Sequence, residues 1–165
     1  MDNDRTCLAY RIEVRAEMIL LENPLNESPL TFPVLECIHI IGFAFSVGTI
    51  ALVDLRLLDV TMPRQTPAQL LKDTSLWTLA GIVTMILSGL MLFSSDPDMY
   101  YLNKSFLLKM VCLALAIVFN YTIHRKVASA KSPPPQAKLV ACLSLALWGA
   151  VVFGGIFIAF VNEGL

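Results

Sequence analysis

The chain has 165 residues, enough for one domain, and 56% of them are hydrophobic while only 15% are charged. Soluble domains carry about 25% charged residues, so the composition argues against a surface exposed to water. A net charge of −1 gives no electrostatic basis for nucleic-acid binding. The four cysteines form no CxxC or Cys/His cluster, which argues against a structural zinc site.

Residues 1–32 form a tail in which apolar and charged residues are mixed between Ala9 and Leu21. This mixture predicts an amphipathic helix that lies in the membrane interface. A poorly ordered extension before Met18 is the alternative, and the sequence does not choose between the two.

Four apolar stretches follow the tail, at about residues 34–57, 74–95, 104–124 and 138–161. A helix needs about 20 apolar residues to cross a bilayer, and no charge interrupts residues 74–95 or 139–162. Prolines and polar residues separate the stretches and predict loops, with a short helix at Pro67–Lys72 in the first loop. We expect an all-α fold, an integral membrane four-helix bundle over residues 33–162.

Positive charges predict how this bundle is oriented. The first and third loops share one side of the membrane and carry Arg56, Arg64, Lys72, Arg125, Lys126, Lys131 and Lys138. The opposite side has Lys104 in its short loop and three arginines in the tail. The positive-inside rule therefore places the first and third loops in the cytoplasm and both termini outside.

Three ionisable residues are expected at the outer end of the bundle. Glu36 lies at the mouth of the first span, and His39 follows one helical turn deeper. Lys109 lies in the third span at a depth that matches His39. Ionisable residues at membrane depth are costly and so suggest a function. Imidazole suits a haem iron or a transition metal, with His39 as the ligand, and Lys109 suits a haem propionate or Glu36. The alternative is that Lys109 reaches the outer surface and His39 bonds a neighbouring helix.

A second polar group is expected at the inner end, where the first and third spans finish. Its members are Asp54, Arg56, Asn120, His124 and Arg125. Pairing of Asp54 with His124 or Arg125 would connect two helices, and a structural role is favoured there. The two histidines lie near opposite membrane faces, so they cannot both ligate one haem within a monomer. A bis-histidine haem would need His39 from two subunits. Otherwise Met or Lys109 would have to be the second ligand.

Several segments resemble known membrane families. The runs Asn26–Pro29, Phe32–Gly42 and Val53–Leu58, together with Phe106–Lys109 and Asn120, resemble a family of uncharacterised four-span bacterial inner-membrane proteins. This resemblance, which runs from about Met18 to the C-terminus, implies a fold in the bacterial inner membrane and no assigned activity. With the orientation predicted from the positive charges, both termini then lie in the periplasm.

The stretch Ile38-His39-Ile40-Ile41-Gly42, with Lys109, is more distantly similar to two other families. These are the haem-binding membrane-bound protoporphyrinogen oxidases and the copper-resistance D-type membrane proteins. The chain has Asp54-Leu55-Arg56 where the oxidases have aromatic-glycine and proline-arginine elements. Only the haem or metal pocket therefore carries over from the resemblance, and not the oxidase activity.

We therefore expect a membrane subunit with a b-type haem held by His39, acting in electron transfer or as an accessory component of a larger complex. The alternative is a protein that transports or handles a copper-like metal. Small residues at four-residue intervals from Cys142 to Gly154 suit helix packing inside the monomer or a homodimer contact. Because the chain has no nucleophile elbow, phosphate-binding loop or paired carboxylates, we expect no independent catalytic activity.

Overall fold

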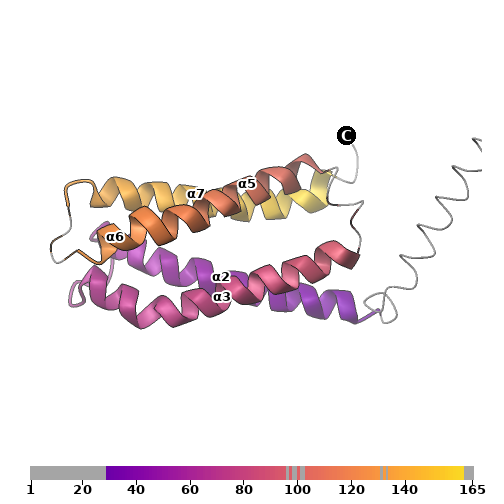
Figure 1. The fold of residues 1–165 in the computed structure, drawn as a ribbon, viewed down its shortest axis with the longest axis horizontal. Helices are drawn as coiled ribbons and strands as arrows, with labels where there is room; N and C mark the ends of the chain where they lie inside the picture. The colour runs from indigo at the N-terminus through magenta and orange to yellow at the C-terminus, as the bar shows by residue number, and fades with distance from the viewer. Residues whose placement is uncertain are drawn as a thin grey trace, which may run out of the picture.

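The computed structural model describes residues 29–95, 97, 100, 103–130, 132 and 134–161, with side chains as far as residue 158. The described residues form long helices (Figure 1): α2 (Thr31–Leu57), α3 (Pro67–Ser95), α5 (Lys104–Phe119), which continues through η1 (Asn120–His124) into α6 (Arg125–Ala128), and α7 (Ala137–Val161). They contain four helices long and apolar enough to cross a membrane. The predicted all-helical, membrane-spanning bundle is therefore confirmed. The predicted interfacial helix of the tail lies outside the described residues.

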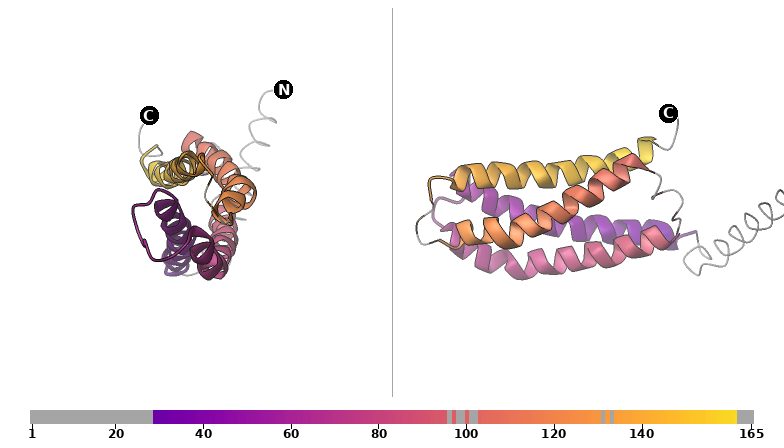
Figure 2. Two further views of the ribbon diagram at one scale, coloured as in Figure 1. Left: turned by 90° about the vertical axis from the view of Figure 1, so that its left-hand side faces the viewer. Right: turned by 45° about the horizontal axis from the view of Figure 1, so that its top comes forward.

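The bundle consists of two antiparallel helix pairs. Helix α2 packs chiefly on α3, and α5 packs chiefly on α7, while α2 and α7 make the main contact between the pairs (Figures 1 and 2). We call the end that holds residues 58–66 and 129–136 the inner end, after the predicted orientation, and the opposite end the outer end. The inner end is closed by a cluster of buried apolar residues from α2, α3, α6 and α7, namely Val53, Leu57, Leu70, Ala128, Ala137 and Ala141.

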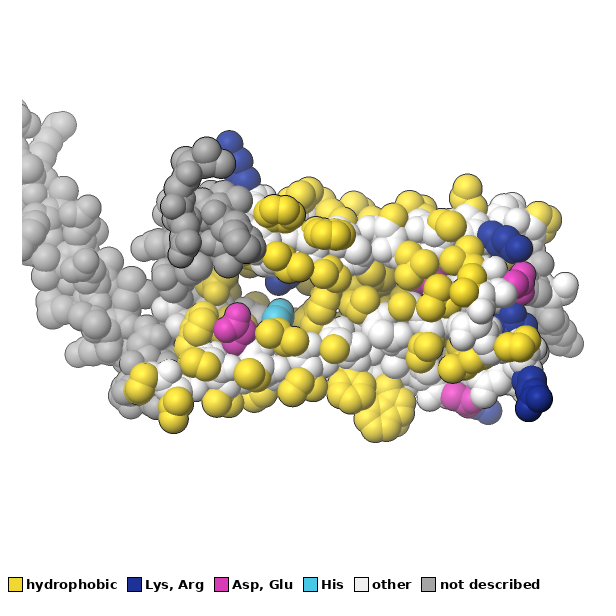
Figure 3. All heavy atoms as spheres, turned by 180° about the vertical axis from the view of Figure 1, so that it is seen from behind, with side chains coloured by type: hydrophobic (Ala, Val, Ile, Leu, Met, Phe, Trp, Pro, Cys, Tyr) yellow, Lys and Arg dark blue, Asp and Glu magenta, His cyan; other side chains and the backbone are white. Residues whose placement is uncertain are grey.

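Large apolar side chains cover the outside of the bundle (Figure 3). Leu76 is 72% exposed, Leu90 62% and Val118 61%, and many other leucines, isoleucines and valines are exposed along the same helices. In water such a continuous apolar surface would drive association. Lipid tails satisfy it without cost, so this is a multi-pass membrane protein in a bilayer.

Helices α2 and α3 approach each other closely where small residues face one another. A Cβ atom built on Gly81 would lie 2.6 Å from the backbone nitrogen of Ser46 and 2.7 Å from the carbonyl oxygen of Gly42. Lipid offers no hydrophobic drive for helix association, so membrane helices depend on close contact of this kind. About one turn closer to the inner end on each helix, the hydroxyl groups of Thr49 and Thr78 form a hydrogen bond of 2.8 Å.

Helix α3 begins earlier than the apolar stretch that predicted it. Residues 67–72 form its first turns and not a separate short helix in the loop. The hydroxyl of Thr66 accepts from the backbone N–H of Gln69 at 3.2 Å, and the Gln69 side chain accepts from the backbone N–H of Thr66 at 3.0 Å. This reciprocal capping box, with Pro67 at the first helical position, starts the helix in the polar segment.

Candidate functional site

His39 is half-buried on α2 and is held by a serine of α3. Its Nδ1 atom lies 3.0 Å from the hydroxyl oxygen of Ser88. The single hydroxyl proton of Ser88 already donates to the carbonyl oxygen of Thr84 at 2.6 Å. The network therefore assigns the proton of this bond to Nδ1, with Ser88 as the acceptor. The Nε2 atom of His39 is left with its lone pair and is able to ligate a metal or accept a proton.

Lys109 lies across the seam between the two helix pairs from His39. The two side chains are close enough to interact electrostatically. The stem of Lys109 packs on α7, where a Cβ atom on Gly154 would lie 3.1 Å from the Cβ of Lys109, and one on Gly155 would lie 3.4 Å from its Nζ. The ion pairs found among the described residues do not include Lys109. The outer end thus holds a half-buried ammonium group without a carboxylate partner in the described part of the chain.

Glu36 does not join His39 and Lys109 in this site. Its side chain is exposed one turn before His39, and no hydrogen bond or ion pair joins it to His39 or Lys109. Figure 3 shows a histidine and an acidic side chain beside an opening between the two helix pairs. The described residues include no group of three or more His, Cys, Asp or Glu side chains that would hold a metal ion. Of the three predicted outer residues, the structure brings together His39 and Lys109.

The glycines of the outer end let both side chains pack against helix backbones. A Cβ atom on Gly89 of α3 would lie 3.0 Å from the Cε1 atom of His39, so the imidazole ring rests on the helix backbone. Gly154 and Gly155 do the same for Lys109 on α7. The outer site is therefore a cationic side chain and an imidazole between glycine-bearing helix faces.

The inner end holds a fully buried Asp–His pair. Asp54 of α2 and His124 of η1 are both 0% exposed, and Oδ1 of Asp54 lies 2.7 Å from Nε2 of His124. Ser144 of α7 interacts with the Asp54 carboxyl group, although its hydroxyl lies outside hydrogen-bond geometry. The pair connects the two helix pairs through α2 and η1.

The other polar residues predicted at the inner end have different environments. Arg56 donates to the carbonyl oxygen of Gln65 at 2.6 Å and to the carboxylate of Asp59 at 3.0 Å. It therefore stabilises the first loop and does not pair with Asp54. Arg125 is exposed, whereas Asn120 is buried. The structure thus pairs Asp54 with His124, one of the two partners that the sequence left open.

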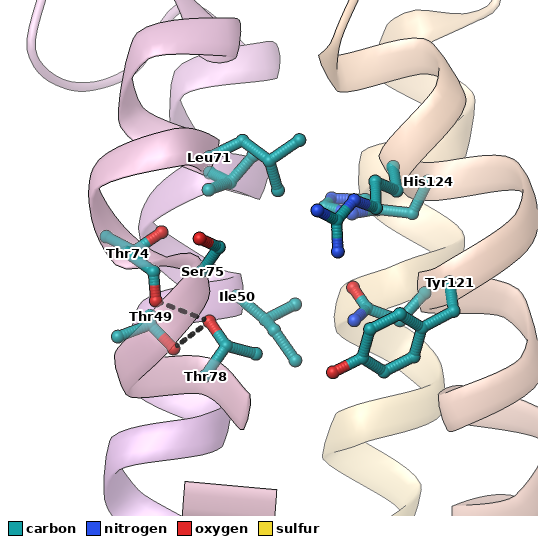
Figure 4. A pocket seen from close by; sticks show the side chains of 11 residues that line it. Thr49, Ile50, Leu71, Thr74, Ser75, Thr78, Tyr121 and His124 are labelled. Carbon is teal, nitrogen blue, oxygen red and sulfur yellow. Dashed lines mark hydrogen bonds between the residues drawn. The ribbon is translucent and has the colours of Figure 1, made fainter. Parts of the chain in front are cut away.

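A small cavity lies next to this pair (Figure 4). Its volume is about 20 Å³, enough for one water molecule. The hydroxyl residues Thr49, Thr74, Ser75 and Thr78 lie on one side, and Asn120, Tyr121, His124 and Arg125 lie on the other. The sequence does not predict that these hydroxyl groups line a cavity, although Thr74 and Thr78 are spaced one helical turn apart.

Comparison with known families gives one match that covers most of the chain. The model of a family of unknown function, DUF6644, matches residues 31–161. This range includes α2 to α7 and therefore both polar clusters. No curated protein and no solved structure matches the chain. The chain belongs to the DUF6644 family of unknown function.

Proposed function

We propose that this protein is an integral membrane subunit that binds a b-type haem at the outer end, where His39 would hold the iron. The observation that carries the proposal is the bond between Nδ1 of His39 and Ser88, which leaves Nε2 free. Histidines that ligate metals commonly donate their other ring N–H to a fixed acceptor, which holds the ring in one orientation. Ser88 has that role here.

The residues around His39 fit a flat, anionic group. Lys109 supplies a positive charge that suits a propionate, and it has no carboxylate partner among the described residues. Gly89, Gly154 and Gly155 let the two side chains pack directly against the backbones of α3 and α7. A bound haem would supply one-electron redox chemistry, while the chain's own residues bind it, orient it and neutralise its charge.

His124 would not hold the same haem, because it lies at the opposite end and is bonded to Asp54. One chain therefore offers a single histidine to the haem. A second ligand would come from His39 of another copy, from a methionine, or from a partner subunit in a larger membrane complex. This supports an electron-transfer or accessory role within an assembly and not independent catalysis.

An optical test separates this proposal from the copper-handling alternative. Protein purified in detergent after expression with a haem supply is expected to show a Soret band and a b-type pyridine haemochrome. The band should be lost in His39→Ala and kept in Glu36→Gln, because Glu36 is exposed and forms no ion pair with His39. Absence of a Soret band in the wild type, or an unchanged band in His39→Ala, would overturn the proposal. Copper that is bound by the wild type and lost in Glu36→Gln would instead favour metal handling.

We also propose that the protein lies in the bacterial inner membrane with its inner end in the cytoplasm and both termini in the periplasm. The support is the excess of lysine and arginine in the loops at the inner end. A cysteine-free variant with a single cysteine at residue 64 should resist a membrane-impermeant maleimide in spheroplasts. One with a cysteine at residue 104 should react. The reverse labelling pattern would invert the orientation.

A further inference from the structure

Three buried polar atoms without hydrogen-bond partners lie in one cluster at the inner end. They are Oδ2 of Asp54, Nδ1 of His124 and the hydroxyl oxygen of Ser144. Buried polar atoms are nearly always satisfied, so each unsatisfied one calls for an explanation. At membrane depth the cost of leaving them unpaired is higher still, because lipid cannot replace the lost bond. Ser144 interacts with the Asp54 carboxyl group without reaching hydrogen-bond geometry, so Nδ1 of His124 is the atom that most calls for a further partner, and it indicates a site that binds something.

The bond between Asp54 and His124 limits the number of protons that the pair can hold. A distance of 2.7 Å between Oδ1 and Nε2 requires one proton between them. If the pair holds only this proton, its net charge is −1 and Nδ1 of His124 is an acceptor. If it holds a second proton, its net charge is 0, and that proton is on Nδ1 of His124 or on Oδ2 of Asp54. His124 lines the cavity at the inner end and Asp54 does not, so a proton that arrives through the cavity is taken up at Nδ1.

The other charged and titratable groups near the inner end are mostly exposed. From the third span Tyr121 and the exposed Arg125 lie nearby. Among the described residues of α3, Lys72 and Asp73 are exposed at its beginning. At the inner end of α7 the exposed Lys138 pairs with Asp59 at 3.4 Å, and Asp59 also pairs with Arg56. Burial of a net charge is costly, so uptake of the second proton neutralises the site.

A cavity with polar groups in its wall lies beside the pair. His124 lines the water-sized cavity, whose other walls carry the hydroxyl groups of Thr49, Thr74, Ser75 and Thr78 and the side chain of Asn120 (Figure 4). A water molecule there can donate to Nδ1 or accept from it, and so serves both protonation states. His124 also ends a π-helical turn, a feature that is frequent at functional sites.

We propose that Asp54 and His124 form a proton-binding site that takes up and releases one proton through the cavity at the inner end. Uptake moves one proton from water to Nδ1 of His124 and changes the net charge of the pair from −1 to 0. Release returns that proton to water by the same route. Ser144 is placed to orient the Asp54 carboxyl group. This site is separate from the proposed haem site and does not depend on it.

Nitrogen NMR of histidine tests the proposal directly. The chain has two histidines, so a His39→Gln variant labelled with ¹⁵N-histidine reports on His124 alone. We expect its Nδ1 signal to change from the unprotonated to the protonated position in a one-proton transition between about pH 10 and about pH 4. Asp59→Asn, a control in the exposed loop, should leave the transition unchanged. An Nδ1 signal that stays constant over this range would overturn the proposal.

Two further variants keep the test valid where loss of a buried carboxylate prevents folding. Ser144→Ala retains both ionisable groups and should displace the midpoint of the transition, because it removes the polar neighbour of Asp54. Ser75→Leu should slow the exchange of the Nδ1 proton with solvent by filling the cavity wall, with little change in midpoint. Asp54→Asn, where it folds, should alter the transition. A His124 transition identical to that of the parent in both Asp54→Asn and Ser144→Ala would show that the pair is not the proton site.

Discussion

Replacement of Gly81 by alanine tests the closest helix contact in the bundle. The new Cβ atom would lie 2.6 Å from the backbone nitrogen of Ser46 and 2.7 Å from the carbonyl oxygen of Gly42. Ordinary contact begins near 3.4 Å, so α2 and α3 would have to separate by about 0.8 Å. Overpacking of this kind costs about 1–3 kcal/mol, while alanine gains about 0.5–1 kcal/mol in helix propensity. We expect a net loss of about 1–2 kcal/mol in the free energy of unfolding.

The chain supplies matched controls for this change. A Cβ atom on Gly48 or on Gly149 would meet no atom within 4 Å, so Gly48→Ala and Gly149→Ala keep the propensity gain without the clash. Unfolding by sodium dodecyl sulfate in mixed micelles, followed by circular dichroism, gives the three free energies. If Gly81→Ala is as stable as the two controls, the close packing of α2 on α3 is refuted.

Three other changes test polar contacts. Asp54→Ala and His124→Ala should each cost about 3–5 kcal/mol because each strands a buried partner; a double-mutant cycle in the same micelles should give a coupling energy, and strict additivity would contradict the pairing. Asn103→Ala removes the N-cap of α5 and the bond from its amide to the carbonyl oxygen of Ile158 at 3.1 Å, so it should cost about 1 kcal/mol or more, seen as faster amide hydrogen exchange in the first turn of α5. Thr49→Val breaks the hydroxyl bond to Thr78 and should cost about 0.6 kcal/mol; a loss above about 2 kcal/mol in the micelle assay would mean that the bond does more than join two helices.

The membrane helices could be predicted from the sequence because lipid imposes a long uncharged stretch on each of them. The beginning of α3 could not be placed by the same criterion. Residues 67–72 follow Pro63 and end at the charged Lys72, next to Asp73, so hydropathy assigns them to a loop that holds a short helix. The capping pattern of Thr66, Pro67 and Gln69 holds the information that hydropathy lacks. Helix ends in water are set by local hydrogen bonds, and helix middles in lipid are set by composition.

The candidate sites could be predicted only as far as depth along a helix determines them. His39 and Lys109 were expected at matching depths, and the structure places them close together. Glu36 is three residues from His39, which turns it by about 60° around the helix axis, and this rotation leaves it exposed. The choice of His124 over Arg125 as the partner of Asp54 depends on the π-helical turn at residues 120–124. No pattern used in the sequence reasoning predicts that turn, and the contacts of Ser88 and Ser144 depend on tertiary packing.

The packing of the bundle explains why its buried ionisable residues lie where they do. Within the α2–α3 pair the helices are so close at Gly42 and Gly81 that even a methyl group does not fit, so that contact has no room for a charged side chain. The faces toward lipid exclude charge on energetic grounds. The seam between the two helix pairs is the remaining position at membrane depth with both space and polar neighbours. Asp54 reaches His124 across this seam, and Lys109, which packs on α7, interacts electrostatically with His39 across it. Both proposed sites therefore follow from one cause, which is that the chain folds as two tight pairs joined by a looser contact.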